Sequence, residues 1–390
     1  MKILITTHTQ FDRNAYSKHL ERAIGLQQRG HEVFFLITSQ KNRFKTSHKE
    51  IEGVNVIMAP DLLWGPLRQG VDPWNIANRV IIALKLDVDL VHTIDSRPVT
   101  ILPAMVLKVF KRTPLFSEWT DLFSRGGTIV ERGSSKFYQA TFGRVEQFFE
   151  EGFKKYADAN FTISSKLKEL LVSFGYPAER VRILPLACNM INALQESKEE
   201  LKRKLSLDTE TIYLLFGGKI FPQDAEFLVE VLRRIQMRRS ENIGLILTGR
   251  HPWVTEDMKD ELGILVTGWV DEQVLFDYLG AADLHVNPMK ITIANKYRFP
   301  CKINDYFVAG RPLITTPISD LEQIHAEYEF GKVTKSDSVE EFVQVLDDML
   351  SERAKWPHYE KEAFRCAGEL LALEKISRDI EEYYVTYGGA

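Results

Sequence analysis

The stretch from Asn295 to Pro317 predicts a loop, a helix, a tight turn and a strand in close succession. Pro300 favours a helix start, because its fixed φ suits the first turn and its missing N–H is not needed there. Gly310 can end the helix in the left-handed conformation, and Pro312 keeps the helix from resuming. The apolar run that follows reads as a short buried strand. The stretch therefore belongs in a parallel α/β sheet.

The start of this predicted helix is a candidate site for an anion. Free N–H groups and the helix dipole favour negative charge at such an end. Lys302 adds a positive charge for phosphate, and Asp305, one turn further on, can accept two hydrogen bonds from a ribose diol. An ordinary αβ unit with no ligand at its helix start explains the same pattern equally well.

Two strand–loop–helix beginnings divide the chain. The first has a strand over residues 2–7, a polar loop, a helix over 16–29 and a second strand over 32–38, and the second begins at Ile212. Each is the opening of a Rossmann-like α/β domain. At 390 residues the chain also exceeds the size at which single hydrophobic cores stop growing, so we expect two domains.

Three longer segments carry a resemblance to a known family. They are FPCKINDYFVAGRPLI, ADANFTISSKLKELLVSFGYPAERVRILPL and VTGWVDEQVLFDYLGAADLHVNPM. All three resemble the retaining nucleotide-sugar glycosyltransferases of family four, which have the GT-B fold. The resemblance implies an α/β chain in which two Rossmann-like domains face each other across an interdomain cleft.

The resemblance also implies domain boundaries and a reaction. An acceptor-binding domain would span residues 1–189 and be joined by the C-terminal helix of about 370–390, and a nucleotide-sugar-binding domain would span 190–369. The implied reaction moves a sugar from the nucleotide-sugar to an acceptor hydroxyl, with retention and without a metal. It would serve the synthesis of a glycan, a polysaccharide or a glycolipid.

The donor segments depart from the family pattern at two charged positions. The usual pattern is Glu, seven residues, Glu; Asp305 stands at the second position, but Tyr297 stands at the first. In the loop that usually meets the donor diphosphate, Lys219 stands at the position of an Arg. Asp224 stands at the position of a Lys and reverses a charge, for which Lys302 can compensate.

The resemblance implies a set of donor-binding residues, of which Lys219 and Lys302 are also predicted to act in catalysis. The donor-binding set is Lys219, Arg250, Trp269, Val270, Asn295, Tyr297, Lys302, Ile303 and Asp305. A solvated loop lysine is the ordinary alternative for Lys219.

Polar residues and glycines near strand ends of the first domain are the candidates for the acceptor side, because ligands of open α/β sheets bind there. They are His8, Arg13, Asp95, Arg97, Glu118, Gly126 and Gly127. The run EWTDLFSRGGT resembles the acceptor-side loop of a subset of the family, and its Asp121 is a predicted catalytic residue. The glycine pair lets backbone approach a ligand or lets the loop move. A mobile surface loop, whose residues satisfy only local backbone, is the alternative.

An aromatic stripe marks a long helix later in the first domain. Its members are Tyr138, Phe142, Phe149, Phe153 and Tyr156. The stripe predicts a face packed in the core rather than one lying on a membrane.

The composition narrows the classes of partner that the chain is expected to bind. The net charge is −4, so bulk attraction to nucleic acid or an anionic membrane is not indicated, although a local basic patch stays open. Three distant cysteines read as reduced thiols of a cytoplasmic protein. No apolar run has the length of a membrane span, and the start lacks the apolar core of a signal peptide.

We expect no metal and no cofactor, because the acidic residues lack a metal-like spacing and a nucleotide-sugar is a substrate. The favoured donor is a UDP- or GDP-sugar and the acceptor a sugar, glycan or glycolipid. Peripheral contact with the inner face of a membrane stays open, as does the oligomeric state. Two other classes also remain: a GT-B-fold nucleotide-sugar epimerase or hydrolase, and a catalytically silent relative that binds a nucleotide or a partner.

Overall fold

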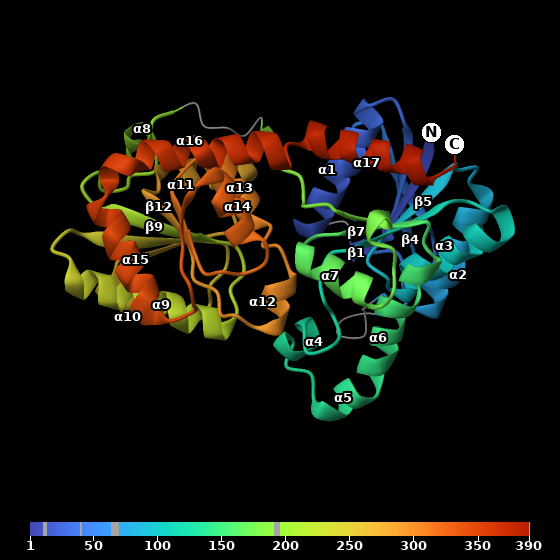
Figure 1. The fold of residues 1–390 in the computed structure, drawn as a ribbon, viewed down its shortest axis with the longest axis horizontal. Helices are drawn as coiled ribbons and strands as arrows, with labels where there is room; N and C mark the ends of the chain where they lie inside the picture. The colour runs from blue at the N-terminus through green and yellow to red at the C-terminus, as the bar shows by residue number, and fades with distance from the viewer. Residues whose placement is uncertain (11–13, 40, 64–69, 191–195, 390) are drawn as a thin grey trace. The chain divides into compact units, whose positions relative to one another are not determined.

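The computed structural model describes residues 1–10, 14–39, 41–63, 70–190 and 196–389. The chain forms two compact units (Figure 1). Unit 1 comprises Met1–Ala187 and Leu373–Ala390, and unit 2 comprises Cys188–Ala372. Arg13, one of the predicted acceptor-side residues, lies outside the described residues.

Unit 1 is built on an eight-stranded sheet in the order β3-β4-β2-β1-β5-β6-β7-β8, in which only the pair β3–β4 of the described strands is antiparallel. The strands are β1 (Lys2–Gln10), β2 (Glu32–Thr38), β3 (Ser47–Ile51), β4 (Val54–Ala59), β5 (Leu90–Ile94), β6 (Leu115–Trp119), β7 (Ala159–Thr162) and β8 (Val181–Ile183). The chain builds outwards from β1 on one side and from β5 on the other. Ligands of such sheets bind beyond the strand ends at this switch point.

Helices cover both faces of this sheet. They are α1 (Asn14–Gln28), α2 (Pro73–Lys85), α3 (Pro98–Lys111), α4 (Thr128–Glu131), α5 (Lys136–Ala140), α6 (Phe142–Gly152), α7 (Ser165–Ser173) and α17 (Leu373–Tyr387). Alternate residues of β1 point to opposite faces. Ile3 and Ile5 pack in one core with α1 and α17, and Leu4 packs in the other with α2 and α3.

Unit 2 has a six-stranded, fully parallel sheet in the order β11-β10-β9-β12-β13-β14 within the described residues. Its strands are β9 (Ile212–Gly217), β10 (Ile243–Thr248), β11 (Ile264–Gly268), β12 (Leu284–Asn287), β13 (Leu313–Thr315) and β14 (Gly331–Val333). Its helices are α8 (Lys198–Lys204), α9 (Pro222–Arg238), α10 (Glu256–Leu262), α11 (Glu272–Ala281), α12 (Ile293–Tyr297), α13 (Lys302–Ala309), α14 (Leu321–Tyr328), α15 (Val339–Ser351) and α16 (Trp356–Cys366). The predicted α/β class with two Rossmann-like domains is confirmed.

The stretch Asn295–Pro317 folds as its sequence predicts from Arg298 onwards, whereas Asn295–Tyr297, predicted as loop, is the end of helix α12. Helix α13 begins at Lys302, Gly310 ends it with a φ of 62°, and β13 follows after Pro312. The C-terminal helix α17 packs on α1 within unit 1. No helix among the described residues is long and apolar enough to cross a membrane.

Two local predictions are wrong. Strand β1 runs on to Gln10, so His8 lies on the strand and not in a loop. The predicted aromatic helix is broken at Thr141 into α5 and α6; Phe149 and Phe153 pack against the core as predicted, but Phe142 and Tyr156 are 61% and 47% exposed. The reason is that α6 turns other residues inwards, as described below.

Candidate functional site

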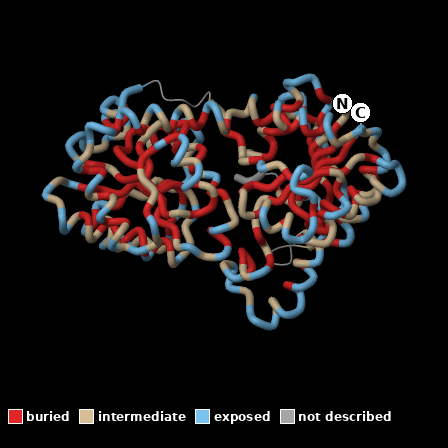
Figure 2. Tube along the Cα trace, in the orientation of Figure 1, coloured by how far each residue is buried: buried red, intermediate tan, exposed pale blue. Residues whose placement is uncertain are grey.

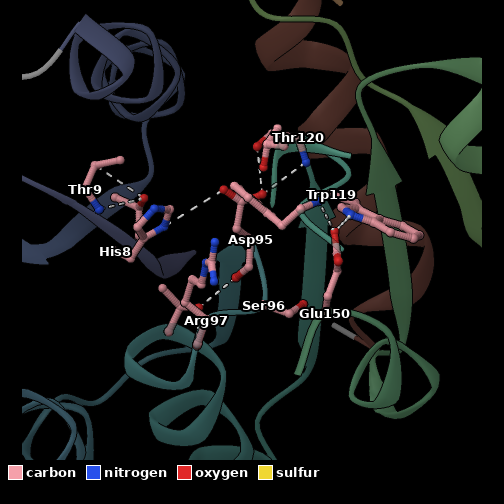
Figure 3. A network of polar contacts seen from close by, with 12 residues as sticks. His8, Thr9, Asp95, Ser96, Arg97, Trp119, Thr120 and Glu150 are labelled. Carbon is pink, nitrogen blue, oxygen red and sulfur yellow. Dashed lines mark hydrogen bonds and ion pairs between the residues drawn. The ribbon is translucent and has the colours of Figure 1, made fainter. Parts of the chain in front are cut away.

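The switch point of the unit 1 sheet brings His8 and Asp95 together (Figure 3). His8 lies on β1 and Asp95 directly follows β5, and the two neighbouring strands place His8 Nδ1 3.9 Å from Asp95 Oδ2. Asp95 has a left-handed backbone, with φ 58°, which few residues other than glycine adopt and which often marks a functional position. The structure thus brings two of the predicted acceptor-side residues together at the strand ends.

The environment of Asp95 favours the protonated acid. Asp95 is only 4% exposed, and burial raises its pKa to about 7, against two hydrogen bonds that stabilise the carboxylate. Both bonds come from Thr120, whose N–H and hydroxyl donate to Oδ1 at 3.1 and 2.7 Å. Burial and the charge of Arg97 lower the pKa of His8. A neutral imidazole therefore faces a carboxyl group that titrates near neutral pH.

A buried lysine completes this cluster. Lys154 is 1% exposed, donates to Ser96 Oγ at 3.2 Å and lies 4.7 Å from the ring centroid of Trp119. Burial lowers its pKa to about 8, while Asp95 acts in the opposite direction. Lys154 was not predicted from the sequence, because a lysine between aromatic residues is typical of a helix surface.

The loop after β6 is held in place by one carboxylate. Glu150 of α6 accepts hydrogen bonds from Trp119 Nε1 at 2.9 Å, from Phe123 N at 2.7 Å and from Ser124 N at 2.8 Å. A Cβ on Gly127 would lie 2.0 Å from the carbonyl oxygen of Leu122, so only glycine fits there. The glycine pair is thus explained by a tight turn, and the loop it belongs to is anchored.

Two other predicted acceptor-side residues, Glu118 and Arg97, form ion pairs within unit 1. Glu118 is fully buried; Arg22 Nη1 donates to both of its oxygens at 2.6 Å, and His92 Nε2 lies 3.2 Å away. Burial alone would raise the pKa of Glu118, but Arg22 and His92 hold it well below its usual range. We therefore assign Glu118 to the interior and correct the prediction that it faces an acceptor. Arg97 lies 3.4 Å from Glu146 and 4.3 Å from the ring centroid of Phe123.

In unit 2 the start of α13 lies at the carboxyl edge of its sheet, beside β9. Lys302 is partly exposed, and its Nζ lies 3.5 Å from the ring centroid of Phe216. Burial of the ammonium lowers the pKa of Lys302 to about 7. The hydroxyl of Tyr306, one turn further along α13, accepts a hydrogen bond from Gly217 N at 2.7 Å and fixes the helix against β9.

The first turn of α13 offers fewer free N–H groups than the sequence suggests. Ile303 N already donates to Pro300 O at 3.0 Å, and Asn304 N donates to Cys301 O at 3.2 Å. The side chain of Ile303 is fully buried, which excludes it as a ligand contact in this state. Anion binding at this end therefore depends mainly on side-chain cations.

The other predicted donor residues divide into surface and structural positions. Arg250 and Trp269 are exposed, and the hydrogen bond from Gly249 N to Gly268 O, at 2.9 Å, brings their two loops together. Asn295 is fully buried and donates to the carbonyl oxygen of Lys290 at 2.9 Å, so its role is structural. Val270, Tyr297 and Asp305 are partly exposed.

No cluster of three or more potential metal ligands occurs among the described residues. Asp87 and Asp89 do form an Asp-x-Asp sequence before β5. Both bind Lys2, one at the side-chain nitrogen and one at the backbone N–H, at 3.3 and 2.7 Å. They lie before the first residue of β5, whereas the candidate site follows its last residue.

Comparison with known proteins identifies the family. The Glycosyltransferase Family 4 model matches residues 20–190, and the Glycosyl transferases group 1 model matches residues 211–352. This chain belongs to the group 1, family 4 glycosyltransferases. The chitobiosyldiphosphodolichol beta-mannosyltransferase of Candida albicans is 22% identical over 286 residues, covering 69% of this chain and 61% of that protein. The chain thus spans about three fifths of the length of the curated relatives it matches.

Solved structures confirm the GT-B fold. Sucrose-phosphate synthase from Thermosynechococcus elongatus superposes with a TM-score of 0.73 at 15% identity, over 99% of this chain and 98% of that one. Anabaena Alr3699/HepE in complex with UDP and glucose gives a TM-score of 0.71 at 14% identity, over 99% of this chain and 100% of that one.

Asp224 has a structural role in unit 2. It is 1% exposed, and its Oδ1 accepts the N–H of Lys290 at 2.8 Å, in the loop that follows β12. Its charge also acts to raise the pKa of Lys302. The acid at this family position therefore anchors a loop and opposes deprotonation of the neighbouring lysine.

A second cation, Arg298, lies over the same ring as Lys219 and was not predicted from the sequence. Lys219 is exposed, and its Nζ lies 4.9 Å from the ring centroid of Phe221; the guanidinium of Arg298 lies 5.5 Å from the same ring. The charge of Arg298 also acts to lower the pKa of Lys302. The sequence does place Arg298 two residues before Pro300, ahead of a helix predicted to bind an anion, and this position could have indicated it.

Proposed function

We propose that this chain transfers a sugar from a nucleotide-sugar to an acceptor hydroxyl, with retention, without a metal and in the cytoplasm. Unit 2 would bind the donor and unit 1 the acceptor. The observation that carries the proposal is the match of both halves, in order, to glycosyltransferase family models. The curated relatives are mannosyltransferases by name, and one structural neighbour binds UDP and glucose, which favours a UDP- or GDP-hexose.

The donor would bind at the carboxyl edge of the unit 2 sheet, where three cations gather. Cleavage of the glycosyl–phosphate bond builds negative charge on the leaving diphosphate, and positioned cations stabilise that charge. Lys302, Lys219 and Arg298 are the proposed cations. Because burial holds the pKa of Lys302 near neutrality, a diphosphate beside it would raise that pKa and keep the ammonium protonated.

The acceptor would bind at the carboxyl edge of the unit 1 sheet. Asp121 lies one residue after Thr120 and is partly exposed, so it is the proposed contact of the acceptor hydroxyl. Its charge contributes to the raised pKa of Asp95, which places the two carboxyl groups near each other. His8 and Arg97 are the proposed neighbours of the acceptor, and the hydrogen bonds of Asp95 to Thr120 position the loop.

The test is a panel of UDP-, GDP-, ADP- and TDP-sugars incubated with the purified chain, with and without acceptor sugars and lipid-linked sugars. Transfer or slow donor hydrolysis that persists in chelator is the expected outcome. Conversion of the donor into another nucleotide-sugar without acceptor would assign an epimerase instead. Binding of a nucleotide with no turnover of any donor would assign a catalytically silent relative.

Asp305 provides a separate test of the donor site. We propose that its carboxylate binds the ribose diol, so Asp305→Ala should weaken binding of the nucleoside diphosphate by about 1.5–3 kcal/mol. Asp257, an exposed acid in the first turn of α10, gives the matched control Asp257→Ala. Calorimetry that finds equal affinities for Asp305→Ala and the wild type would remove the ribose assignment.

A further inference from the structure

Helix α6 exposes more apolar surface than an ordinary surface helix. Its buried residues are Gly143, Glu146 and Glu150, and Phe149 packs against the core, whereas Phe142, Val145 and Phe148 are 61%, 52% and 61% exposed. A surface helix of a globular protein normally turns its apolar stripe to the core. Three apolar side chains of α6 are instead directed to solvent.

The inward carboxylates explain the orientation of the helix. Glu150 anchors the loop after β6 through three hydrogen bonds. Glu146 accepts the hydroxyl of Tyr138 at 3.0 Å and lies 3.4 Å from Arg97. Rotating the helix to bury its aromatic residues would break this network. The outward apolar face is therefore a fixed feature of the unit.

The apolar surface continues onto α5, and cations accompany it. Phe137 is 75% exposed, and Lys136 and Arg144 are exposed beside the aromatic residues. Neither cation takes part in an ion pair with any described residue. In Figure 1, α4, α5 and α6 lie together at one edge of unit 1, and Figure 2 draws much of the tube there in the exposed colour.

A hollow beside α6 repeats the same chemistry. It has a volume of about 520 Å³, and Arg144 and Lys155 line it together with Phe148 and Phe174. Glu151, the acid in its wall, is paired with Arg125 at 2.9 Å. The hollow therefore offers two cations over an apolar floor.

We propose that this surface docks on an anionic membrane. We call it the α5–α6 face and define it by Lys136, Phe137, Phe142, Arg144, Val145 and Phe148. Aromatic residues interleaved with Lys and Arg are typical of helices that lie in a lipid interface, and anionic lipid of the cytoplasmic leaflet attracts such cations. A protein partner is less suited, because the cores of protein interfaces are depleted in Lys.

The docking does not depend on the sugar-transfer reaction, but it would have a consequence for the site. The helix that carries the α5–α6 face also anchors, through Glu150, the loop that bears Thr120 and Asp121. Docking would bring this loop towards the lipid interface. The acceptor best suited to such a site is a sugar carried on a lipid.

The experiment is co-sedimentation of the full chain with phosphatidylcholine vesicles, with and without phosphatidylglycerol. The wild type should bind the anionic vesicles, and added salt should weaken binding. The double variant Phe142→Ser/Phe148→Ser should lower the partition constant by about tenfold or more, because two apolar side chains no longer enter the interface. The variant Lys136→Glu/Arg144→Glu should remove the preference for anionic lipid.

The control is Val109→Ser/Phe110→Ser on α3, whose side chains are 64% and 77% exposed. It should bind vesicles like the wild type, and all variants should melt at the wild-type temperature, since every changed residue is exposed. Absence of wild-type binding to anionic vesicles would overturn the proposal. So would equal binding by the Phe142/Phe148 variant, or a wild-type dimer that this variant dissociates, which would make a second copy the occupant.

Discussion

The carboxyl edges of the two sheets differ in how far their charged side chains are paired within the fold. In unit 1 two buried acids are satisfied inside the fold, Glu118 by Arg22 and Glu150 by the loop it anchors. In unit 2 the cations lie over aromatic rings, and no ion pair of the described residues includes Lys219 or Lys302. Charge that the fold has already neutralised stabilises the fold, whereas charge held over a ring remains able to bind an anion.

The largest expected effect tests whether Glu118 stabilises the fold of unit 1. Glu118→Ala removes the two carboxylate acceptors of Arg22 Nη1, keeps the weaker bond from Nη2 to Pro185 O, and leaves a buried guanidinium without its counter-ion. We expect a loss of about 3–5 kcal/mol in the free energy of unfolding. Urea unfolding followed by circular dichroism measures the change, and Glu151→Ala, at a partly exposed acid, is the control. A variant as stable as the wild type would return Glu118 to the list of acceptor contacts.

A second test reverses the charge of Asp224. Its family position suggests that Asp224→Lys should help donor binding, but the carboxylate is buried and holds Lys290 N. A lysine there would lose this hydrogen bond and face Lys302, so we expect destabilisation by about 3 kcal/mol. Thermal unfolding distinguishes the outcomes. Asp224→Asn, which keeps an acceptor for Lys290 N, should be affected much less.

A third test asks whether the cation over Phe216 serves catalysis. Lys302→Ala should lower kcat/KM for transfer by about ten- to a thousandfold, because a positioned cation is lost from the leaving group. Lys219→Ala should act in the same direction. Lys296, exposed on α12, supplies the control Lys296→Ala. Transfer at the wild-type rate by both variants would show that these lysines are only surface charges.

The sequence predicted the fold well, because the signals for it are local. Pro300, Gly310 and Pro312 determine where α13 starts and stops, and each acts through its own backbone. The resemblance then supplied the order of the two units. What it did not supply is the direction in which a side chain points once two elements pack.

The site was predicted less well for that reason. Glu118 looked like an exposed strand-end acid until Arg22, from a distant helix, was placed beside it. Lys154 has no sequence pattern of its own, and Arg298 is marked only by its place before Pro300. The rings beside which these cations lie, Trp119 and Phe221, are known only from the structure. The aromatic residues of α6 have a helical spacing, but spacing alone does not predict that Glu146 and Glu150 lie on the buried face of this helix.

The smallest expected effect concerns Asp95, a buried acid of unit 1 that accepts two hydrogen bonds but has a raised pKa. Burial raises its pKa from 3.8 to about 7, so between these values the folded state binds more protons than the unfolded state. Its contribution to stability is therefore present below about pH 4 and is lost as the pH rises through about 7. Asp95→Asn keeps an Oδ1 for the two hydrogen bonds of Thr120 and cannot ionise.

Unfolding free energies of wild type and Asp95→Asn, compared at about pH 5 and about pH 7.5, measure this contribution. The variant should gain about 2–3 kcal/mol on the wild type between the two conditions. The upper pH stays below the pKa of Lys154, which burial lowers to about 8, so that most of this lysine remains protonated. Burial lowers the pKa of His8 well below the usual value, and His8 is present in both proteins. A constant difference between the two proteins would mean that Asp95 is ionised in the fold, and that unit 1 also presents unneutralised charge at its sheet edge.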